Sequence, residues 1–242
     1  MDHDAGSDER LRPSRRLHAY HPLRLLAAAL RAEAAHTPEP ILDLGCGSKP
    51  YDSLLPAPSI GLDVQHVHGR PDAVAFAEHL PIRSGSIGTA LSTQQLEHVE
   101  DPELVLREAR RVLVPEGRLL LSTHGVWAHH PDPKDLWRWT EEGLVTLVTS
   151  CGFRVERTHR LGGPVLAGVL LATYPLAGAS RSRSVMRHLA RLALALLNLV
   201  VGPLDRFVER LAPRHYGSVG YLVVAVADDR GADTRTTSPG LR

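Results

Sequence analysis

A glycine-rich turn after a short apolar run carries the clearest chemical signal in the sequence. The segment Ile41–Gly47 reads Ile-Leu-Asp-Leu-Gly-Cys-Gly, so a buried strand would end in two glycines separated by one residue. Glycines let the backbone turn sharply and approach a ligand that a side chain would exclude. Asp63 closes the next apolar run, 20 residues after Asp43. In a βαβ unit this spacing predicts a carboxylate at the tip of the second strand, where it can bind both hydroxyls of a ribose.

The same turn distinguishes between two classes of nucleotide ligand. Counted from Gly45, the sixth position of a dinucleotide-binding fingerprint is Pro50 in place of glycine, which disfavours a pyrophosphate. Asp43 stands two residues before Gly45 and suits a cationic ligand, such as the sulfonium and ammonium groups of S-adenosylmethionine. A plain structural turn is the alternative, but the added carboxylate of Asp63 favours a cofactor site.

Four segments, which occur in order within residues 41–161, resemble the type-11 class I methyltransferases. They are Asp43–Gly47, the strand end at Asp63, Leu96–Pro102 and Arg111–Thr123. The resemblance implies an α/β fold with a doubly wound, mostly parallel seven-stranded sheet whose last strand is antiparallel. It also implies that S-adenosylmethionine is the cofactor and that its methyl group is transferred to an acceptor.

The resemblance further implies which residues contact the cofactor. Gly45 and Gly47 would border its methionine moiety, and Asp63 its ribose. The other expected contacts are Asp43 before the loop, Ala77 and Glu78 beside the adenine, and Thr93 and Gln94 beside the sulfonium.

The chain departs from the family pattern at three places. Phe76 stands where the family usually has aspartate, so a hydrogen bond to the adenine amino group would be lost, and Phe76 would pack on the ring or join the core. Gly88 ends a Ser-Ile-Gly run where Ser-Phe-Asp is usual. The third glycine of the cofactor loop is replaced around Lys49 and Pro50.

The segment His124–Trp139 is dense in histidine, tryptophan and aspartate, and its prolines argue against a regular element. Because ligands of open α/β sheets bind outside the carboxyl ends of the strands, this segment is a candidate lid over the acceptor. The candidate catalytic residues are His124, His129 and His130, since histidine can take a proton from an oxygen or nitrogen nucleophile. Trp137 and Trp139 would stack on or shield an acceptor. The alternative is that the tryptophans only pack the lid and the histidines are solvated.

We expect no metal site in this region. His129, Asp132 and Asp135 could suggest one, but a metal needs convergent ligands with supporting partners, and no further ligand signal is present. We assign Glu97 and His98 to the start of the following helix and not to catalysis.

The spacing of apolar residues and the positions of proline and glycine predict one main domain. The expected divisions are a disordered lead-in over 1–16, a methyltransferase domain over 17–230 and a disordered tail over 231–242. An N-terminal helix is predicted at Leu17–Ala35, and a helical insertion at 161–215 would separate the last two strands.

The helical insertion allows three interpretations. Leu161–Ala179 has no charged residue, and it is followed by arginines and by a helical stripe of leucine and valine. The insertion could cover the acceptor site or form a homodimer interface. Peripheral membrane contact through 161–211 is the second interpretation, because arginines beside an apolar helix suit anionic headgroups. A transmembrane hairpin is the third.

Composition narrows the classes of partner. A formal net charge of +1 disfavours nucleic acid, so a small-molecule or lipid-linked acceptor is expected. Two distant cysteines favour a reducing, cytoplasmic setting, with the membrane surface as the alternative location. Two other functions stay open: an NAD-dependent dehydrogenase, and a non-catalytic membrane-associated module that retains the fold.

Overall fold

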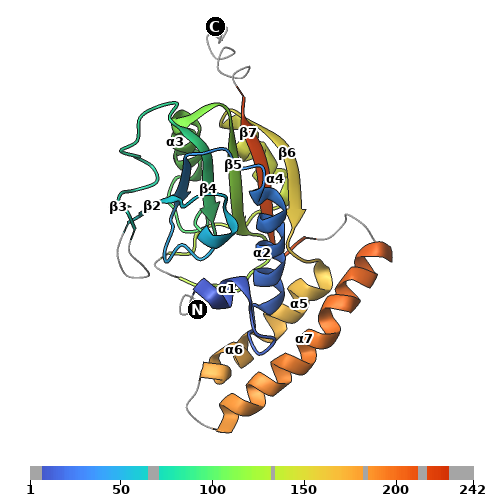
Figure 1. Ribbon diagram of the computed structural model, residues 1–242. Helices are drawn as coiled ribbons and strands as arrows, with labels where there is room; N and C mark the ends of the chain where they lie inside the picture. Colours follow the sequence, from blue (N-terminus) through green and yellow to red (C-terminus); the bar gives the residue numbers. More distant parts are fainter. Residues whose placement is uncertain (1–6, 65–70, 132–133, 182–184, 212–216, 229–242) are drawn as a thin grey trace, which may run out of the picture.

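Short apolar runs and amphipathic segments build a seven-stranded sheet with helices on both faces (Figure 1). The computed structural model describes residues 7–64, 71–131, 134–181, 185–211 and 217–228. The strands are β1 Ile41–Leu44, β2 Ile60–Asp63, β3 Ala73–Val74, β4 Ile87–Thr93, β5 Leu113–His124, β6 Phe153–Arg160 and β7 Gly220–Ala227.

The sheet has the strand order β3-β2-β1-β4-β5-β7-β6. The strands β1 to β5 pair in parallel, and β7 is antiparallel to both β5 and β6. The expected doubly wound α/β sheet with an antiparallel last strand is therefore confirmed. The carboxyl ends of β1, β4 and β5 meet at one edge, because these three strands are parallel neighbours.

Helices cover both faces of the sheet, and alternate residues of the central strands pack against opposite helix layers. Leu119 and Leu121 of β5 pack into a core with α3 (Pro102–Val112) and α4 (Glu141–Ser150). Leu120 faces the other side, into a core with α2 (Tyr20–Ala34). Successive strand residues point to opposite faces, so one leucine run serves both layers.

Capping hydrogen bonds fix the starts of α3 and α4. The Asp101 carboxylate accepts a hydrogen bond from the Leu104 amide at 2.9 Å, directly before α3. The Thr140 hydroxyl oxygen accepts one from the Gly143 amide at 3.1 Å, before α4. A short 3₁₀ turn, η1 (Asp52–Leu54), follows the loop after β1.

The N-terminal segment differs from the expected disordered lead-in over 1–16. Residues 7–16 are described, and they contain a short helix, α1 (Ser7–Leu11). Leu11 packs against the core around α2, which supplies the apolar contact that holds this helix. Residues 1–6, and the tail expected over 231–242, lie outside the described part of the chain.

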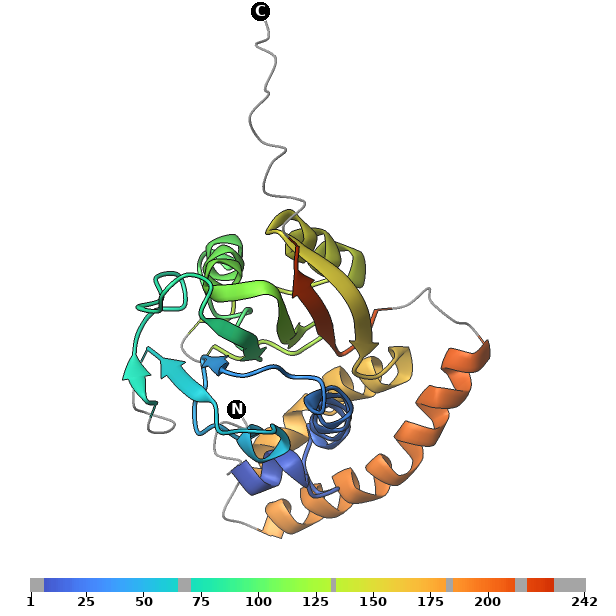
Figure 2. The same cartoon turned by 45° about the horizontal axis from the view of Figure 1, so that its top comes forward.

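Three helices form the insertion between β6 and β7. They are α5 (Pro164–Ala172), α6 (Tyr174–Arg181) and α7 (Val185–Leu211). Leu166 and Leu170 of α5 pack against Val201 of α7. Asp205 of α7 accepts hydrogen bonds from the first amides of α5, at Gly163 (2.7 Å) and Leu166 (2.9 Å). In Figure 2, α7 runs along the outside of the molecule, on the far side of α2 and α5 from the sheet.

Candidate active site

A cavity of about 620 Å³ opens at the carboxyl ends of β1, β2 and β4. Seven of the eight residues expected to bind the cofactor line it: Gly45, Gly47, Asp63, Ala77, Glu78, Thr93 and Gln94. The structure thus brings together residues that are spread over 50 positions of the sequence, because each follows a neighbouring strand. The size and place of this cavity suit a nucleotide-sized ligand.

Left-handed backbone conformations shape the loop after β1. Gly45 has φ 65° and Gly47 has φ 50°, values that glycine adopts without a side-chain penalty. Lys49, at the place of the family's third glycine, has φ 52° and keeps the same turn. The Gly47 amide donates a hydrogen bond to Asp63 Oδ2 at 2.9 Å. Asp63 therefore also fixes the loop against the tip of β2.

Asp43 is the one expected cofactor contact that does not line the cavity. Its side chain is buried, and its Oδ1 accepts no hydrogen bond from the described residues. Burial, together with the nearby Asp52, raises the pKa of Asp43 to about 8. Asp43 is thus buried at the end of β1 and does not reach the cavity surface.

The structure accounts for two departures from the family pattern. Phe76 does not belong to the core, since its side chain is 65% exposed and lies on the wall of the large cavity. At Gly88, an added Cβ atom would come within 2.5 Å of the carbonyl oxygens of Pro38 and Glu39. A side chain at that position would clash with the backbone of the preceding loop.

A second, smaller cavity of about 80 Å³ adjoins the first. The two share Arg10, Gln94 and His98 as wall residues. Gln94 directly follows β4 and has φ 53°, a conformation that is costly for a residue with a side chain and that often marks functional positions. The other wall residues come mainly from α2, from the lid and from the start of β7.

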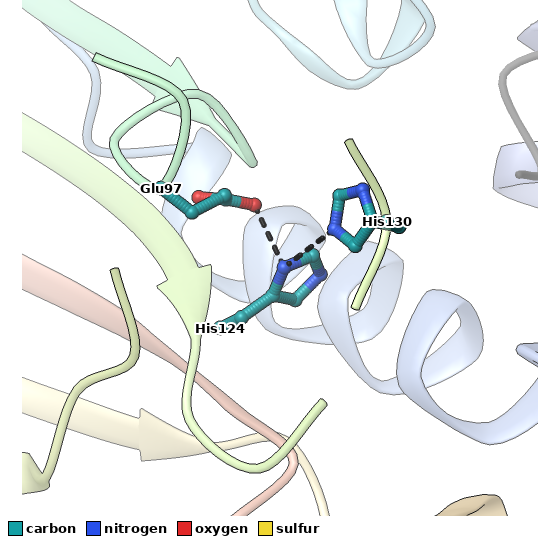
Figure 3. Close-up of side chains that lie close together, drawn as sticks. All are labelled: Glu97, His124 and His130. Carbon is teal, nitrogen blue, oxygen red and sulfur yellow. Dashed lines mark hydrogen bonds and ion pairs between the residues drawn. The ribbon is translucent and has the colours of Figure 1, made fainter. Parts of the chain in front are cut away.

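Three buried side chains meet at the wall of the smaller cavity (Figure 3). His124 is the last residue of β5, Glu97 lies in the turn after β4, and His130 comes from the lid. Glu97 Oε1 lies 2.9 Å from His124 Nδ1, and His130 Nε2 lies 3.1 Å from the same nitrogen. Thr123 donates a hydrogen bond to Glu97 Oε2 at 2.8 Å.

The charges of these groups depend on burial and on each other. Burial raises the pKa of Glu97, but the adjacent His124 and His98 outweigh it and lower the pKa to about 2. Burial and the charges of His124 and His98 lower the pKa of His130 to about 3. Glu97 is therefore ionised and His130 is neutral at physiological pH.

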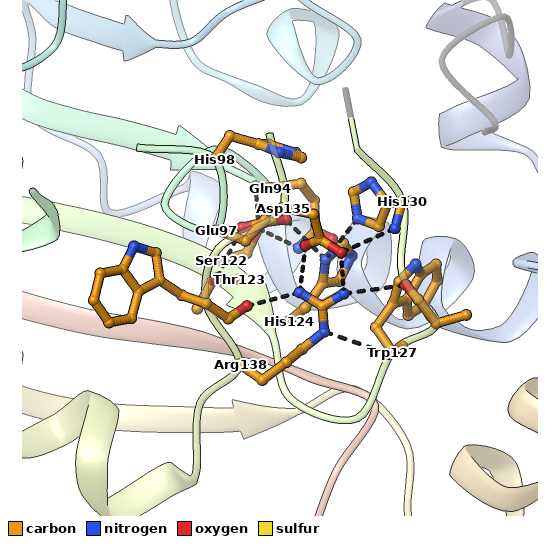
Figure 4. A network of polar contacts seen from close by, with 12 residues as sticks. Gln94, Glu97, His98, Ser122, Thr123, His124, Trp127, His130, Asp135 and Arg138 are labelled. Atoms are coloured by element: carbon orange, nitrogen blue, oxygen red, sulfur yellow. Dashed lines mark hydrogen bonds and ion pairs between the residues drawn. The ribbon is translucent and has the colours of Figure 1, made fainter. Parts of the chain in front are cut away.

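Asp135 holds the lid in place (Figure 4). Its carboxylate accepts hydrogen bonds from the Arg138 guanidinium at 2.5 and 2.6 Å and from the His130 amide at 2.9 Å. Arg138 also donates to the carbonyl groups of Trp127 and Ala128. Although burial raises the pKa of Asp135, its bonds to Arg138 and His130 outweigh this and hold the pKa well below its usual range.

Only two of the three candidate catalytic histidines line a cavity. His124 and His130 do so, whereas the side chain of His129 is 74% exposed and faces Asp135 at 3.2 Å. The tryptophans of the lid differ in their positions. Trp127 lines the smaller cavity and stacks on the His124 ring with a centroid distance of 4.4 Å. Trp137 and Trp139 line neither cavity and stack on each other.

The sequence analysis missed two wall residues, Arg10 and Trp127, and the buried Glu97 beside the wall residue His124. Glu97 lies in a turn and not in the helix that begins at Pro102, and its position directly after a parallel strand was the signal that could have found it. Trp127 gave the same kind of signal after β5. Arg10 gave none, since it reaches the site from a segment expected to be disordered.

Comparisons with known proteins agree with this geometry. Residues 42–121 match the family model described as a methyltransferase domain. The chain is similar to a ubiquinone biosynthesis O-methyltransferase of Xanthomonas euvesicatoria, with 29% identity over 130 residues, 46% of this chain and 53% of that protein. The chain thus spans about half the length of the curated relatives it matches.

Solved structures share the fold at low sequence identity. A methyltransferase from Mesorhizobium loti that depends on S-adenosylmethionine has a TM-score of 0.51 and 19% identity, with 84% of this chain and 97% of that chain covered. The (4+2)-cyclase SpnF has a TM-score of 0.52 and 19% identity, with 85% and 80% covered. The fold alone therefore does not decide the reaction. Residues 42–121, which match the methyltransferase domain model, contain the glycine-rich loop and the strand ends that surround the larger cavity.

Proposed function

We propose that this chain is an S-adenosylmethionine-dependent methyltransferase with a small-molecule or lipid-linked acceptor. The observation that carries the proposal is the pair of adjoining cavities. The larger is bordered by the cofactor loop and by Asp63, and the smaller by His124 and His130. Their common wall at Gln94 is where a methyl group would pass from one ligand to the other.

The residues would act mainly by positioning. S-adenosylmethionine would supply the methyl group on a sulfonium, whose loss leaves a neutral thioether. Asp63 would bind the ribose, while the loop at Gly45 and Gly47 lets the ligand approach the backbone. The lid and α1 would exclude water and hold the acceptor in line with the methyl group. Orientation of this kind can lower the activation barrier substantially. His124 and His130 would take part in removing the acceptor's proton.

The test is calorimetric titration of the chain with S-adenosylhomocysteine and, separately, with NAD. We expect binding of the first only, because Pro50 stands on the cavity wall where a dinucleotide site needs glycine. Methyl transfer from labelled S-adenosylmethionine into a lipid and metabolite extract would follow. Binding of NAD alone would favour the dehydrogenase, and tight binding without transfer to any fraction would favour the non-catalytic module.

We also propose that the chain is cytoplasmic and contacts membranes peripherally through α7. This helix packs on α5 through one face, while the opposite face exposes a row of large apolar side chains: Val185, Met186, Leu189, Leu192, Leu196, Leu199, Val200, Leu204, Phe207 and Leu211. Within the described residues it is the helix that is long and apolar enough to cross a membrane by length and composition. A surface of this kind marks an interaction site.

Charge favours an anionic lipid surface as the occupant over a second copy of the chain. Arg191, Arg206 and Arg210 are exposed on α7 beside the apolar row. The acidic residues of the helix lie on its packed side, where Asp205 is buried as the cap of α5 and Glu209 is half-buried. An apolar face flanked by cations is typical of helices that lie in the plane of the membrane interface. The alternative is a homodimer through the same face, which vesicle co-sedimentation distinguishes from membrane contact.

A further inference from the structure

Three potential metal ligands converge on one point at the wall of the smaller cavity. The atoms are Glu97 Oε1, His124 Nδ1 and His130 Nε2, and all three lie within 4.8 Å of one another (Figure 3). All three side chains are buried. The cluster could not be expected from sequence spacing, because its members come from the turn after β4, from the end of β5 and from the lid.

Two close contacts meet at one nitrogen of this cluster. His124 Nδ1 can carry at most one proton, yet it faces both Glu97 Oε1 at 2.9 Å and His130 Nε2 at 3.1 Å. Glu97 Oε1 is fully buried, and the 2.9 Å approach of His124 Nδ1 is the contact it makes in this cluster. A cation between the three groups would bind the lone pairs of Glu97 Oε1, His124 Nδ1 and His130 Nε2 at the same time.

We propose that Glu97, His124 and His130 together bind one divalent transition-metal cation. Two histidines and one carboxylate are a ligand set of catalytic zinc and of non-haem iron sites. Metal–ligand bonds of about 2.0–2.2 Å put neighbouring ligand atoms roughly 3 Å apart. The separations of 2.9 and 3.1 Å already match this spacing. The two imidazoles favour zinc or iron over magnesium or calcium, which prefer oxygen ligands.

The surroundings provide the outer contacts that such a site needs. The Thr123 hydroxyl holds the second oxygen of Glu97 at 2.8 Å. Trp127 stacks on the His124 ring, and Asp135 fixes the backbone amide of His130 at 2.9 Å. Partners of this kind orient metal ligands, and their loss typically lowers metal affinity 10- to 100-fold.

Three protein ligands leave a coordination position for a ligand from outside the chain. Because His124 and His130 line the smaller cavity, an oxygen of an acceptor there could fill it. This use of the site rests on the proposed methyl transfer. The cation would lower the pKa of a bound hydroxyl, whose proton is released to water, and the histidines would serve as its ligands in place of a free base. The acceptor class is then a compound with a hydroxyl on an alcohol, phenol or enol.

The experiment measures metal binding directly on the full chain. After treatment with a chelator, Zn²⁺ is titrated by calorimetry, and Co²⁺ is added separately to record the visible d–d bands of a nitrogen- and oxygen-ligated ion. We expect one equivalent to bind. Glu97→Gln and His130→Asn should each weaken Zn²⁺ binding by more than about 100-fold, and Thr123→Val by about 10- to 100-fold. His129→Asn, which removes an exposed neighbouring histidine, should leave it unchanged.

A separate titration with S-adenosylhomocysteine distinguishes this proposal from the proposed function. Each variant should bind that ligand like the unaltered chain, which also reports an intact fold. Failure to bind Zn²⁺, or binding that neither Glu97→Gln nor His130→Asn weakens, would overturn the metal site and leave the cofactor assignment standing. One-to-one Zn²⁺ binding that depends on both residues would support the site even if S-adenosylhomocysteine did not bind.

Discussion

The carboxylate of Glu97 lies 2.9 Å from the imidazole of His124, although the two residues are 27 positions apart in the chain. Glu97 follows β4 and His124 ends β5, and these strands are parallel neighbours in register from Thr89 to Thr93. Both side chains therefore lie at the same edge of the sheet, where the carboxyl ends of β4 and β5 meet. The lid then adds His130, so that one contact between two strand ends becomes the centre of a buried polar cluster.

Asp63→Ala should weaken binding of S-adenosylhomocysteine by about 1.5–3 kcal/mol, the usual value of hydrogen bonds to a charged acceptor. The same change removes the bond from the Gly47 amide, so the loop after β1 should also become less ordered. Calorimetry gives the affinity, and Asp228→Ala, far from the cavity, is the control. Unaltered affinity in a folded Asp63→Ala protein would contradict the ribose assignment.

Gly47→Val should abolish cofactor binding without unfolding the chain. A Cβ atom at Gly47 meets no other atom within 4 Å, so the new side chain would extend into the cavity that Gly47 borders. Gly85→Val is a matched control, since Gly85 also has a positive φ and open space but lies outside both cavities. Gly45 is a poorer probe, because its Cβ would meet the Gln95 side chain at 2.4 Å. Equal losses of affinity in both valine variants would mean that backbone strain alone is responsible.

His124→Asn should reduce turnover by roughly 10²- to 10⁴-fold, the range expected when a group that assists proton removal is lost. Affinity for S-adenosylhomocysteine should stay unchanged, because His124 does not line the larger cavity. His129→Asn, on the exposed side of the lid, should alter turnover much less. Normal turnover in His124→Asn and in His130→Asn would show that orientation alone drives the reaction.

Glu33→Gln should lower the free energy of unfolding by about 1–3 kcal/mol. Glu33 of α2 is buried against the sheet and binds Arg118 at 3.0 Å, Arg157 at 2.6 Å and His159 at 2.9 Å. Burial raises its pKa, but these partners outweigh burial and lower it to about 2. Because the folded pKa lies below the ordinary value, the stabilisation is present above that value, near 4.5, and is lost as the pH falls toward 2.

Urea unfolding at neutral pH and near pH 3 checks this expectation. The difference between the unaltered chain and Glu33→Gln should be large at neutral pH and smaller in acid. Glu116→Gln, which removes an exposed ion pair with Arg154, should change stability by less than about 1 kcal/mol. A difference for Glu33→Gln that does not depend on pH would refute the role of its charge.

The unaltered chain should co-sediment with anionic vesicles more than with neutral ones. Each arginine near an anionic surface contributes about 1 kcal/mol, and salt should weaken this part. The apolar row should add a part that resists salt. Leu196→Glu, in the middle of that row, should reduce binding strongly, whereas Thr149→Glu on α4 has the same charge change and should not. No binding to either vesicle, together with a dimer that Leu196→Glu dissociates, would establish the homodimer instead.

Local signals in the sequence were sufficient for the elements and for most of the cofactor loop. The capping residues Asp101 and Thr140 and the turn at Gly45 and Gly47 act through bonds to residues close in the chain. Their effect does not depend on how the rest of the molecule folds. The family resemblance then implied a mostly parallel sheet, and a parallel sheet places Thr93 beside the loop.

Tertiary structure decided which side chains face the site. All four residues of β1 are buried, so its sequence pattern has no polar face that could show which way Asp43 points. Glu97 and His130 meet only because β4 and β5 are adjacent and Asp135 fixes the lid. For α7, the sequence predicted an apolar stripe, but only the packing of the folded chain determined that Leu194 and Val201 are covered and that Leu192 and Leu196 are exposed. Sequence periodicity records that a face is apolar, whereas what covers that face depends on distant residues that only the folded chain brings together.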